Sequence, residues 1–386
     1  MALQTTTLQH LIDQIANARA AQQTLRIRGG DTKDFYGNAL GNFAVLDTRS
    51  HSGITSYEPS ELVVTAKAGT PLAELEAALL DKNQYLPFEP PSFSTGGTSA
   101  SVQASSSTVG GMVASGLSGA ARASSGSVRD HILGVQIVNG ASEVLNFGGT
   151  VMKNVAGYDV SRLMAGSMGT LALITEVSLK VLPVPAGDAT IGFDITQAEA
   201  LALMNRWRSQ PLPINSTAWV DGRGSALGRN ALFVRLRGAK AAVDSASARL
   251  IADHKGYALP SESSPTVWRS ANNHAMSFFT PPTDDLCLWR LSVAAATPEL
   301  ELPYPQLVEW QGAQRWLWAR ATEGAALQAI ASKAGGHATL FKSSASGLEA
   351  NKVGGVFQPL APVLAKVNQN LREQLDPHQV FNTRRI

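Results

Sequence analysis

The sequence predicts an α+β protein of two domains. Its 386 residues exceed the length at which a single hydrophobic core usually stops growing. In the second half, a strand–strand–helix–strand order occurs twice, which indicates two ferredoxin-like units or one larger α+β sheet. One large domain with an appendage is the alternative that the length leaves open.

Composition restricts the class of protein. Apolar residues make up 44% of the chain and charged residues 16%, so the chain can bury a large core and is not of a disordered type. The net charge is only +2 and no dense tract of Lys or Arg occurs. We therefore expect no nucleic acid among its partners.

Cysteine content and hydropathy restrict the compartment. Cys287 is the only cysteine, which excludes a disulfide framework and a cysteine-ligated iron–sulfur cluster within the chain. The least polar run, residues 163–174, is too short to span a bilayer. No cationic segment followed by a continuous apolar one opens the sequence, so we predict no signal peptide and a cytoplasmic location.

The first elements lead into a glycine turn. Leu8, Leu11 and Ile15 fall on one face of a helix predicted over residues 7–21. A strand at Leu25–Arg28 then runs into Gly29-Gly30-Asp31-Thr32-Lys33, called the 29–33 loop below. Such a turn presents main-chain N–H groups that can bind phosphate. An ordinary turn at the end of a strand is the alternative.

The next segment resembles a nucleotide-binding βαβ unit only in outline. Strands are predicted at residues 44–47 and 62–66, and a helix starts after Pro71 with Leu72, Leu75 and Leu79 on one face. No Gly-x-Gly-x-x-Gly follows a strand, and no Gly-Lys-Ser occurs. NAD or ATP binding by those folds is therefore unsupported.

A long uncharged stretch organises the first half. Residues 90–121 contain no Asp, Glu, Lys or Arg, and residues 110–119 within them are mostly glycine and small side chains. We expect close approach of the backbone to a bulky ligand there, and a helix from about Met112 whose N-terminus faces an anion. A flexible Ser/Gly linker is the alternative. Strands are predicted after it at residues 132–138, 143–147 and 171–182.

The second half alternates strands and helices. Thr196 and Glu199 form a capping box that opens a helix through about Arg208. The other predicted helices cover residues 239–254, 323–334 and 362–375, and the predicted strands cover residues 214–220, 231–236, 286–293, 307–310, 316–320 and 337–342.

Several of these motifs, in order, resemble one flavoprotein family. The glycine-rich core, Lys153-Asn154-Val155-Ala156-Gly157-Tyr158-Asp159 and Gly166-Ser167-Met168-Gly169-Thr170 resemble the FAD-binding domain of the vanillyl-alcohol oxidase (PCMH-type) family. More narrowly, residues 219–223 and 309–316 are similar to those of FAD-binding subunits of glycolate oxidase (glycolate dehydrogenase). The resemblance implies a two-lobed PCMH-type domain over residues 1–185 and a ferredoxin-like, FAD-linked oxidase-type α+β domain over residues 186–386.

The resemblance also implies where FAD would lie. It places FAD against the 29–33 loop and against parts of residues 102–118 and 168–174. The implied cofactor-binding residues are Arg28, Gly29, Gly30, Asp31, Thr32, Lys33, Ser107, Thr108, Gly110, Gly111, Ser115, Gly116, Ser118, Gly119, Arg129, Asp130, Gly169, Thr170, Leu173 and Ile174. For Arg28, Arg129 and Lys153, a structural or solvated ion pair is the alternative reading.

Two departures from the family pattern affect these expectations. Many family members that bind flavin covalently through the first loop carry a histidine there, and this chain has Asp31 and Thr32 instead, so we expect non-covalent FAD. Many members end on Asp-Pro…Phe-Asn-Pro-Gly-Arg, and here Thr383-Arg384-Arg385 replaces the final part. No ligand contact is therefore assigned to the C-terminus.

The resemblance implies the FAD-binding subunit of a complex that oxidises glycolate, a small 2-hydroxy acid. Its partners would be a larger FAD-containing subunit and an iron–sulfur subunit, with attachment at the inner face of the cytoplasmic membrane only through them. No catalytic base or metal site is recognisable, since His254, His274, His337 and His378 are isolated. A carboxylate could be held by Arg235, Arg290, Arg320 or Lys342. A stand-alone FAD oxidoreductase for another hydroxy acid and a flavin-free scaffold are the alternatives.

Overall fold

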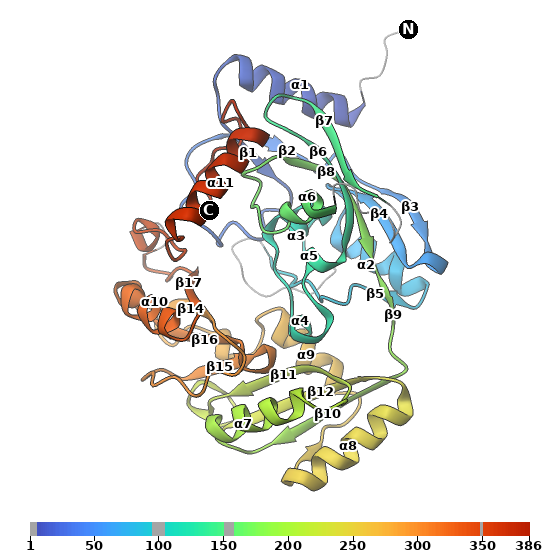
Figure 1. The fold of residues 1–386 in the computed structure, drawn as a ribbon, viewed down its shortest axis with the longest axis vertical. Coiled ribbons are helices and arrows are strands. Elements are labelled where there is room, and N and C mark those ends of the chain that lie inside the picture. Colours follow the sequence, from blue (N-terminus) through green and yellow to red (C-terminus); the bar gives the residue numbers. More distant parts are fainter. Residues whose placement is uncertain (1–5, 95–104, 150–157, 348–349) are drawn as a thin grey trace. The chain divides into compact units, whose positions relative to one another are not determined.

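The structure is a computed structural model that describes residues 6–94, 105–149, 158–347 and 350–386. It contains two compact units (Figure 1). The first unit comprises Met1–Leu117, Ser127–Pro183 and Pro359–Ile386, and the second comprises Ser118–Gly126 and Val184–Gln358. The predicted α+β class is confirmed, because both units combine helices with antiparallel sheets.

The units differ from the sequence-based division in two segments. Residues 118–126 were expected in the first domain and belong to the second unit, whereas Pro359–Ile386 was expected in the second domain and belongs to the first unit. The reason for the second difference is apolar packing. Leu375 is buried in the main core of the first unit, and Val380 and Phe381 are fully buried against its N-terminal helix and strands.

The first unit contains two sheets of functional interest. A parallel pair joins β1 (Leu25–Arg28) to β2 (Ala44–Asp47). An antiparallel five-stranded sheet has the order β3-β4-β8-β6-β7. Its strands are β3 (Ile54–Glu58), β4 (Val63–Lys67), β6 (Ile132–Val138), β7 (Val144–Gly148) and β8 (Leu173–Lys180), and β5 (Gln84–Tyr85) pairs separately with β9 (Leu182–Pro183).

Helices of the first unit cover these sheets. They are α1 (Thr7–Ala20), α2 (Leu72–Asp81), α3 (Val109–Ser115), α5 (Val128–His131), α6 (Tyr158–Leu163) and α11 (Pro362–Leu375). Leu11 and Ile15 of α1 pack with Leu25 and Leu46, so α1 fixes the β1–β2 pair. Residues of α2 and α3 share a core with β4, β6 and β8. Each sheet therefore has its own apolar support, and α1 supports the pair from which the 29–33 loop leaves.

Helix α2 offers a direct test of this core. Leu79 is fully buried in it, whereas the adjacent Leu80 is 68% exposed. Leu79→Ala should reduce the free energy of unfolding by about 2–5 kcal/mol, because the lost side chain leaves a cavity that its neighbours fill only in part. Leu80→Ala is the matched control and should change it by no more than about 0.5 kcal/mol. Urea denaturation of both variants measures the difference, and equal effects would contradict this assignment of the core.

The second unit is built on one eight-stranded antiparallel sheet of order β13-β10-β12-β11-β15-β16-β14-β17. Its strands are β10 (Gly187–Phe193), β11 (Ile214–Val220), β12 (Ala231–Gly238), β13 (Tyr257–Ala258), β14 (Cys287–Ser292), β15 (Gln306–Glu309), β16 (Gln314–Ala319) and β17 (His337–Lys342). Its helices are α4 (Arg122–Ser125), α7 (Gln197–Arg208), α8 (Lys240–His254), α9 (Ser264–Asn272) and α10 (Gly324–Lys333).

Two apolar cores support this sheet. Leu203 and Trp207 of α7 and Leu250 of α8 pack on β10, β11 and β12. Leu327 of α10 packs on β14, β16 and β17. The predicted capping box at the start of α7 is present, with Glu199 Oε2 accepting from the Thr196 main-chain N–H at 2.9 Å. In the described parts of the chain, no helix combines the length and the apolar character needed to cross a membrane.

Candidate FAD-binding site

A pocket in the first unit opens where β1 ends. Its lining comes from the end of β1, the 29–33 loop, helix α3, a turn before β8 and the C-terminal tail. The lining residues are Arg26, Ile27, Gly29, Gly30, Asp31, Thr32, Lys33, Asp34, Leu40, Thr108, Gly111, Ala114, Ser115, Met168, Gly169, Thr383 and Arg385. Four segments that are distant in sequence, at residues 26–40, 108–115, 168–169 and 383–385, thus meet at one place.

The 29–33 loop presents its main chain to this pocket. Within the described residues, none of the main-chain N–H groups of Gly29, Gly30, Asp31, Thr32 and Lys33 has a hydrogen-bond acceptor. Polar main-chain groups normally find partners in a folded protein. A row of unsatisfied N–H groups in a turn is therefore suited to an anionic ligand. The loop begins a left-handed turn at Asp31, whose φ is 55°.

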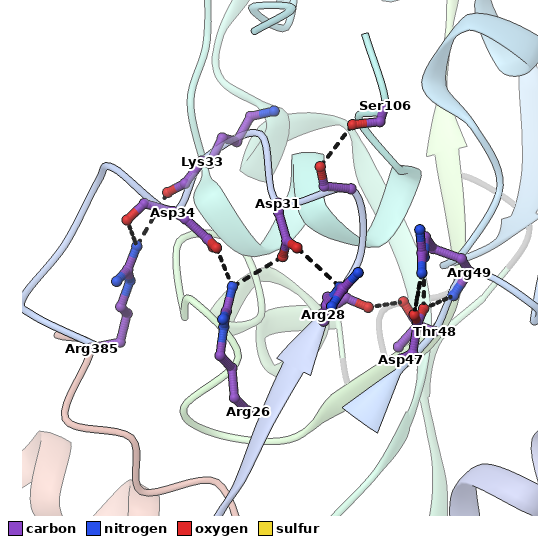
Figure 2. Close-up of polar contacts among 11 residues, drawn as sticks. Arg26, Arg28, Asp31, Lys33, Asp34, Asp47, Thr48, Arg49, Ser106 and Arg385 are labelled. Atoms are coloured by element: carbon purple, nitrogen blue, oxygen red, sulfur yellow. Dashed lines mark hydrogen bonds and ion pairs between the residues drawn. The ribbon is translucent and has the colours of Figure 1, made fainter. Parts of the chain in front are cut away.

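Ion pairs join the 29–33 loop to the arginines of β1 (Figure 2). Arg26 Nη2 lies 3.0 Å from Asp31 Oδ1, and Arg28 Nε lies 3.0 Å from Asp31 Oδ2. Arg26 also pairs with Asp34. Burial raises the pKa of Asp34, while the positive charge of Arg26 opposes that rise. Both carboxylates are thus engaged by arginines, so they do not oppose an anion in the pocket with free negative charge.

Lys33 brings a positive charge to the pocket, and both hydrogen-bond acceptors of its ammonium in the described residues are hydroxyl groups. Its Nζ donates to Thr32 Oγ1 at 3.2 Å and to Ser107 Oγ at 3.1 Å, and it lies 5.9 Å from the centre of the Phe93 ring. Burial lowers its pKa to about 8. No carboxylate of the described residues pairs with Lys33. A lysine in this situation is stabilised by an anion that enters the pocket.

Glycine is required at two positions of the loop. A Cβ on Gly29 would lie 2.4 Å from Thr108 Oγ1, and a Cβ on Gly30 would lie 1.7 Å from the carbonyl oxygen of Ser106. Ser106 Oγ also donates to the Gly30 carbonyl at 2.7 Å (Figure 2). Gly30 therefore lies directly against the main chain of Ser106, and Gly29 lies against the side chain of Thr108, so the loop packs closely on this segment.

The expectation for helix α3 is wrong in one respect. The helix forms, but its first N–H groups have protein partners. Val109 donates to the Thr70 carbonyl at 2.9 Å, Gly110 to the Ala68 carbonyl at 2.8 Å, and Gly111 to Thr108 Oγ1 at 3.2 Å. The residues that follow β4 occupy the N-terminus of α3, so it offers no free donors to an anion. The glycines allow this close packing, since a Cβ on Gly110 would lie 2.7 Å from that of Ala68.

The pocket collects about half of the residues that the sequence assigned to the cofactor. Those in its lining are Gly29, Gly30, Asp31, Thr32, Lys33, Thr108, Gly111, Ser115 and Gly169. Arg28 and Ser107 do not line the pocket but contact the loop. Arg28 pairs with Asp31, and Ser107 Oγ lies 2.9 Å from Thr32 Oγ1. Met168, within the predicted segment 168–174, lines the pocket as well.

The other assigned residues lie outside the lining. Gly110 packs on Ala68, and Gly116 ends α3 in a left-handed conformation. Asp130 caps α5 by accepting from Ser127 N at 2.8 Å, and it pairs with Arg162. Residues 102–104 and Lys153 fall outside the described residues. The remaining members are exposed Arg129, buried Thr170, Leu173 and Ile174 of the first unit, and Ser118 and Gly119 of the second unit.

Sequence reasoning missed several lining residues. They are Arg26, Ile27, Asp34, Leu40, Ala114, Thr383 and Arg385. Arg26 and Asp34 flank the predicted loop, so extending it on both sides would have found them. Thr383 and Arg385 stand more than 340 residues along the chain, where the departure from the family ending removed the signal.

The second unit holds a buried acid that the search for a base also missed. Glu309 of β15 is 4% exposed and accepts from Gln314 Nε2 at 2.9 Å and Trp316 Nε1 at 2.7 Å. Burial raises its pKa to about 7, so this carboxyl can exchange a proton near neutral pH. His274 stacks on Phe279, and burial lowers its pKa to about 3, aided by Lys342 and Arg290. His274 is therefore neutral and a weak base.

Comparison with known proteins shows which family the chain resembles. A family model described as an FAD binding domain matches residues 1–148. The chain is 40% identical over 378 residues to glycolate oxidase subunit GlcE of Escherichia coli (strain K12), which covers 98% of this chain and 97% of that protein. It is 29% identical to glycolate oxidase subunit GlcD of Bacillus subtilis (strain 168), over 38% of this chain and 29% of that protein.

Solved structures extend the likeness to the whole fold. An alkyldihydroxyacetonephosphate synthase superimposes with a TM-score of 0.64 at 17% identity, covering 97% of this chain and 75% of that one. At such low identity the likeness concerns the fold alone. The resemblance drawn from the glycine-rich motifs is confirmed, as is FAD as the cofactor. The chain belongs to the family of glycolate oxidase subunit GlcE, among the FAD-dependent oxidoreductases that share this FAD binding domain.

Proposed function

We propose that this chain is the FAD-binding subunit of a complex that oxidises glycolate to glyoxylate. The observation that carries the proposal is the similarity to glycolate oxidase subunit GlcE, which extends over nearly the full length of both chains. The similarity to subunit GlcD is confined to a shorter part, which supports a larger, related FAD-containing subunit as a separate partner. The two units would then serve as the FAD-binding domain and the C-terminal domain.

The pocket would hold FAD non-covalently, with its diphosphate at the 29–33 loop. The free N–H groups of the loop would donate to the phosphate oxygens, and Lys33 would supply the positive charge. Among the lining residues that the structure describes, none is a histidine, cysteine or tyrosine that could bond to the flavin. The uncharged face of Ile27, Ala114, Met168 and Gly169 would lie along the rest of the cofactor.

Electrons would leave this chain through a partner. FAD, when bound, accepts a hydride from a donor such as a hydroxy acid. The sequence has one cysteine, Cys287, which is buried in the second unit, so a cysteine-ligated cluster would have to belong to another subunit. We propose that an iron–sulfur subunit takes the electrons and that any contact with the membrane is made through the partners.

Visible absorbance of the purified protein tests the proposal. The spectrum is recorded before and after acid precipitation, and again after anaerobic addition of glycolate, with D-lactate as the comparison substrate. Flavin released into the supernatant and bleached by glycolate supports non-covalent FAD and oxidation by this chain. Flavin that stays oxidised until the partner subunits are added supports a role in electron transfer. Absence of flavin after reconstitution with FAD would leave a scaffold and overturn the proposal.

A further inference from the structure

We propose that Arg385, the penultimate residue, is a positioning residue that holds the 29–33 loop in its FAD-binding shape. The inference rests on the proposed function, because it takes the loop as the site of the diphosphate. It assigns a role in cofactor binding to the C-terminal tail.

The guanidinium of Arg385 binds three main-chain carbonyls, one at the last residue of the 29–33 loop and two in the turn that follows it. Arg385 is 4% exposed, and its Nη1 donates to the Asn38 carbonyl at 3.0 Å. Its Nη2 donates to the carbonyls of Lys33, at 3.3 Å, and Asp34. In return, the Asn38 main-chain N–H donates to the Arg385 carbonyl at 2.9 Å. Figure 2 shows the side chain of Arg385 reaching the main chain at Lys33 and Asp34.

The turn is shaped to admit this side chain. Gly37 has a φ of +95°, and a Cβ there would lie 2.9 Å from Arg385 Nε and 3.1 Å from its Cδ. The planar fork of arginine can serve several acceptors at once, whereas a lysine ammonium presents a single nitrogen. The contacts therefore require an arginine at position 385 and a glycine at position 37.

The tail is anchored independently of Arg385. Asp376 accepts from the main-chain N–H groups of Val380, at 2.8 Å, and Phe381, at 2.7 Å. Val380 and Phe381 are themselves fully buried with α1 and β1. Removal of the guanidinium should therefore leave the tail in place and affect the turn that it binds.

Arg385 affects FAD binding by fixing the orientation of the peptide groups that it binds. Arg385 and Thr383 line the same pocket as the loop. While Arg385 binds the carbonyls of Lys33 and Asp34, these oxygens point to the guanidinium and are held there. Without it they would be free to rotate toward the diphosphate and repel it, and one positive charge would be lost beside Asp34.

Titration of ligand-free protein with FAD, followed by quenching of flavin fluorescence, tests the proposal. Arg385→Gln should weaken FAD binding by about tenfold or more, since hydrogen bonds from a charged donor are lost. Arg384→Gln is the matched control: it removes the same charge from an exposed neighbour and should stay within about twofold of wild type. Arg385→Lys should resemble Arg385→Gln, because it keeps the charge and loses the fork.

Circular dichroism and the thermal midpoint of the ligand-free variants separate positioning from general stability. The proposal expects folded Arg385→Gln protein with weakened FAD affinity. Wild-type affinity in Arg385→Gln, or full rescue by Arg385→Lys, would overturn it. If Arg385→Gln does not fold, the comparison of Arg385→Lys with wild type decides. Failure of the wild-type chain itself to bind FAD would instead overturn the proposed function.

Discussion

Gly30→Ala is expected to abolish retention of FAD. The new Cβ would lie 1.7 Å from the carbonyl oxygen of Ser106 and 2.4 Å from its carbon, far inside van der Waals contact. Main chain rather than a flexible side chain is in the way, and the Ser106 hydroxyl ties the two segments together at 2.7 Å. The loop would therefore have to separate from the Ser106–Thr108 segment, and its row of N–H groups would no longer converge on one anion.

Flavin content after purification and the affinity of ligand-free protein for FAD measure this effect. Gly111→Ala gives a graded comparison in the same pocket, because its Cβ would meet only Thr108 Oγ1, at 3.1 Å. Gly354→Ala is the control for the substitution itself, since its Cβ would meet no atom within 4 Å. A Gly30→Ala protein that binds FAD as tightly as wild type would show that the loop does not carry the diphosphate.

The sequence predicts the elements of this fold where the apolar pattern is clear. The strands Leu25–Arg28, Ile132–Val138 and Ile214–Val220 and the helix Pro362–Leu375 have the predicted bounds. Strand β3 has no predicted counterpart, because Thr55, Ser56 and Glu58 are exposed at the edge of the sheet and give no buried alternation. The strand order of the large sheet depends on pairings between distant segments, which local patterns do not contain.

The candidate site likewise has parts that the local sequence predicts and parts that depend on tertiary packing. The 29–33 loop is predicted because consecutive glycines after a strand are a local signal. The roles of Ala68 and Thr70 as acceptors for helix α3 are not predictable, since they depend on how the end of β4 meets the helix. Arg385 reaches the loop only through tertiary packing of the tail. Local chemistry therefore identifies the loop, whereas its supports require the folded chain.

Lys33→Met is expected to weaken FAD binding by about 10- to 100-fold below pH 8, because a buried charge-assisted contact to the diphosphate is lost. The same substitution should raise the thermal midpoint of the ligand-free protein at neutral pH. In the wild-type chain, burial disfavours the charged ammonium, and two hydroxyl groups and the Phe93 ring compensate for only part of its lost hydration. Lys82→Met, at an exposed lysine, is the matched control and should change neither quantity.

The pH dependence gives the sharper test, because deprotonation of Lys33 should raise the stability of the ligand-free protein and lower its affinity for FAD. Its pKa is about 8 in the ligand-free fold and 10.5 for the unperturbed side chain, so the unfolded chain binds more protons between these values. This lysine's contribution to stability therefore rises as the pH increases from about 8 to 10.5. A bound diphosphate raises the pKa again, so FAD affinity should fall as the pH rises above about 8, by at most about tenfold per pH unit.

Titrations of wild type and Lys33→Met between neutral and alkaline pH separate this group from all others that ionise in the same range. The other charged residues of the pocket lining are Asp31, Asp34, Arg26 and Arg385, and each should keep its ion pair or carbonyl contacts in the variant. The fall in affinity should be present in wild type and absent in Lys33→Met. Identical pH profiles would place the diphosphate away from Lys33, whereas a difference in affinity that is full below about pH 8 and shrinks as the pH rises assigns the titrating charge to this one ammonium.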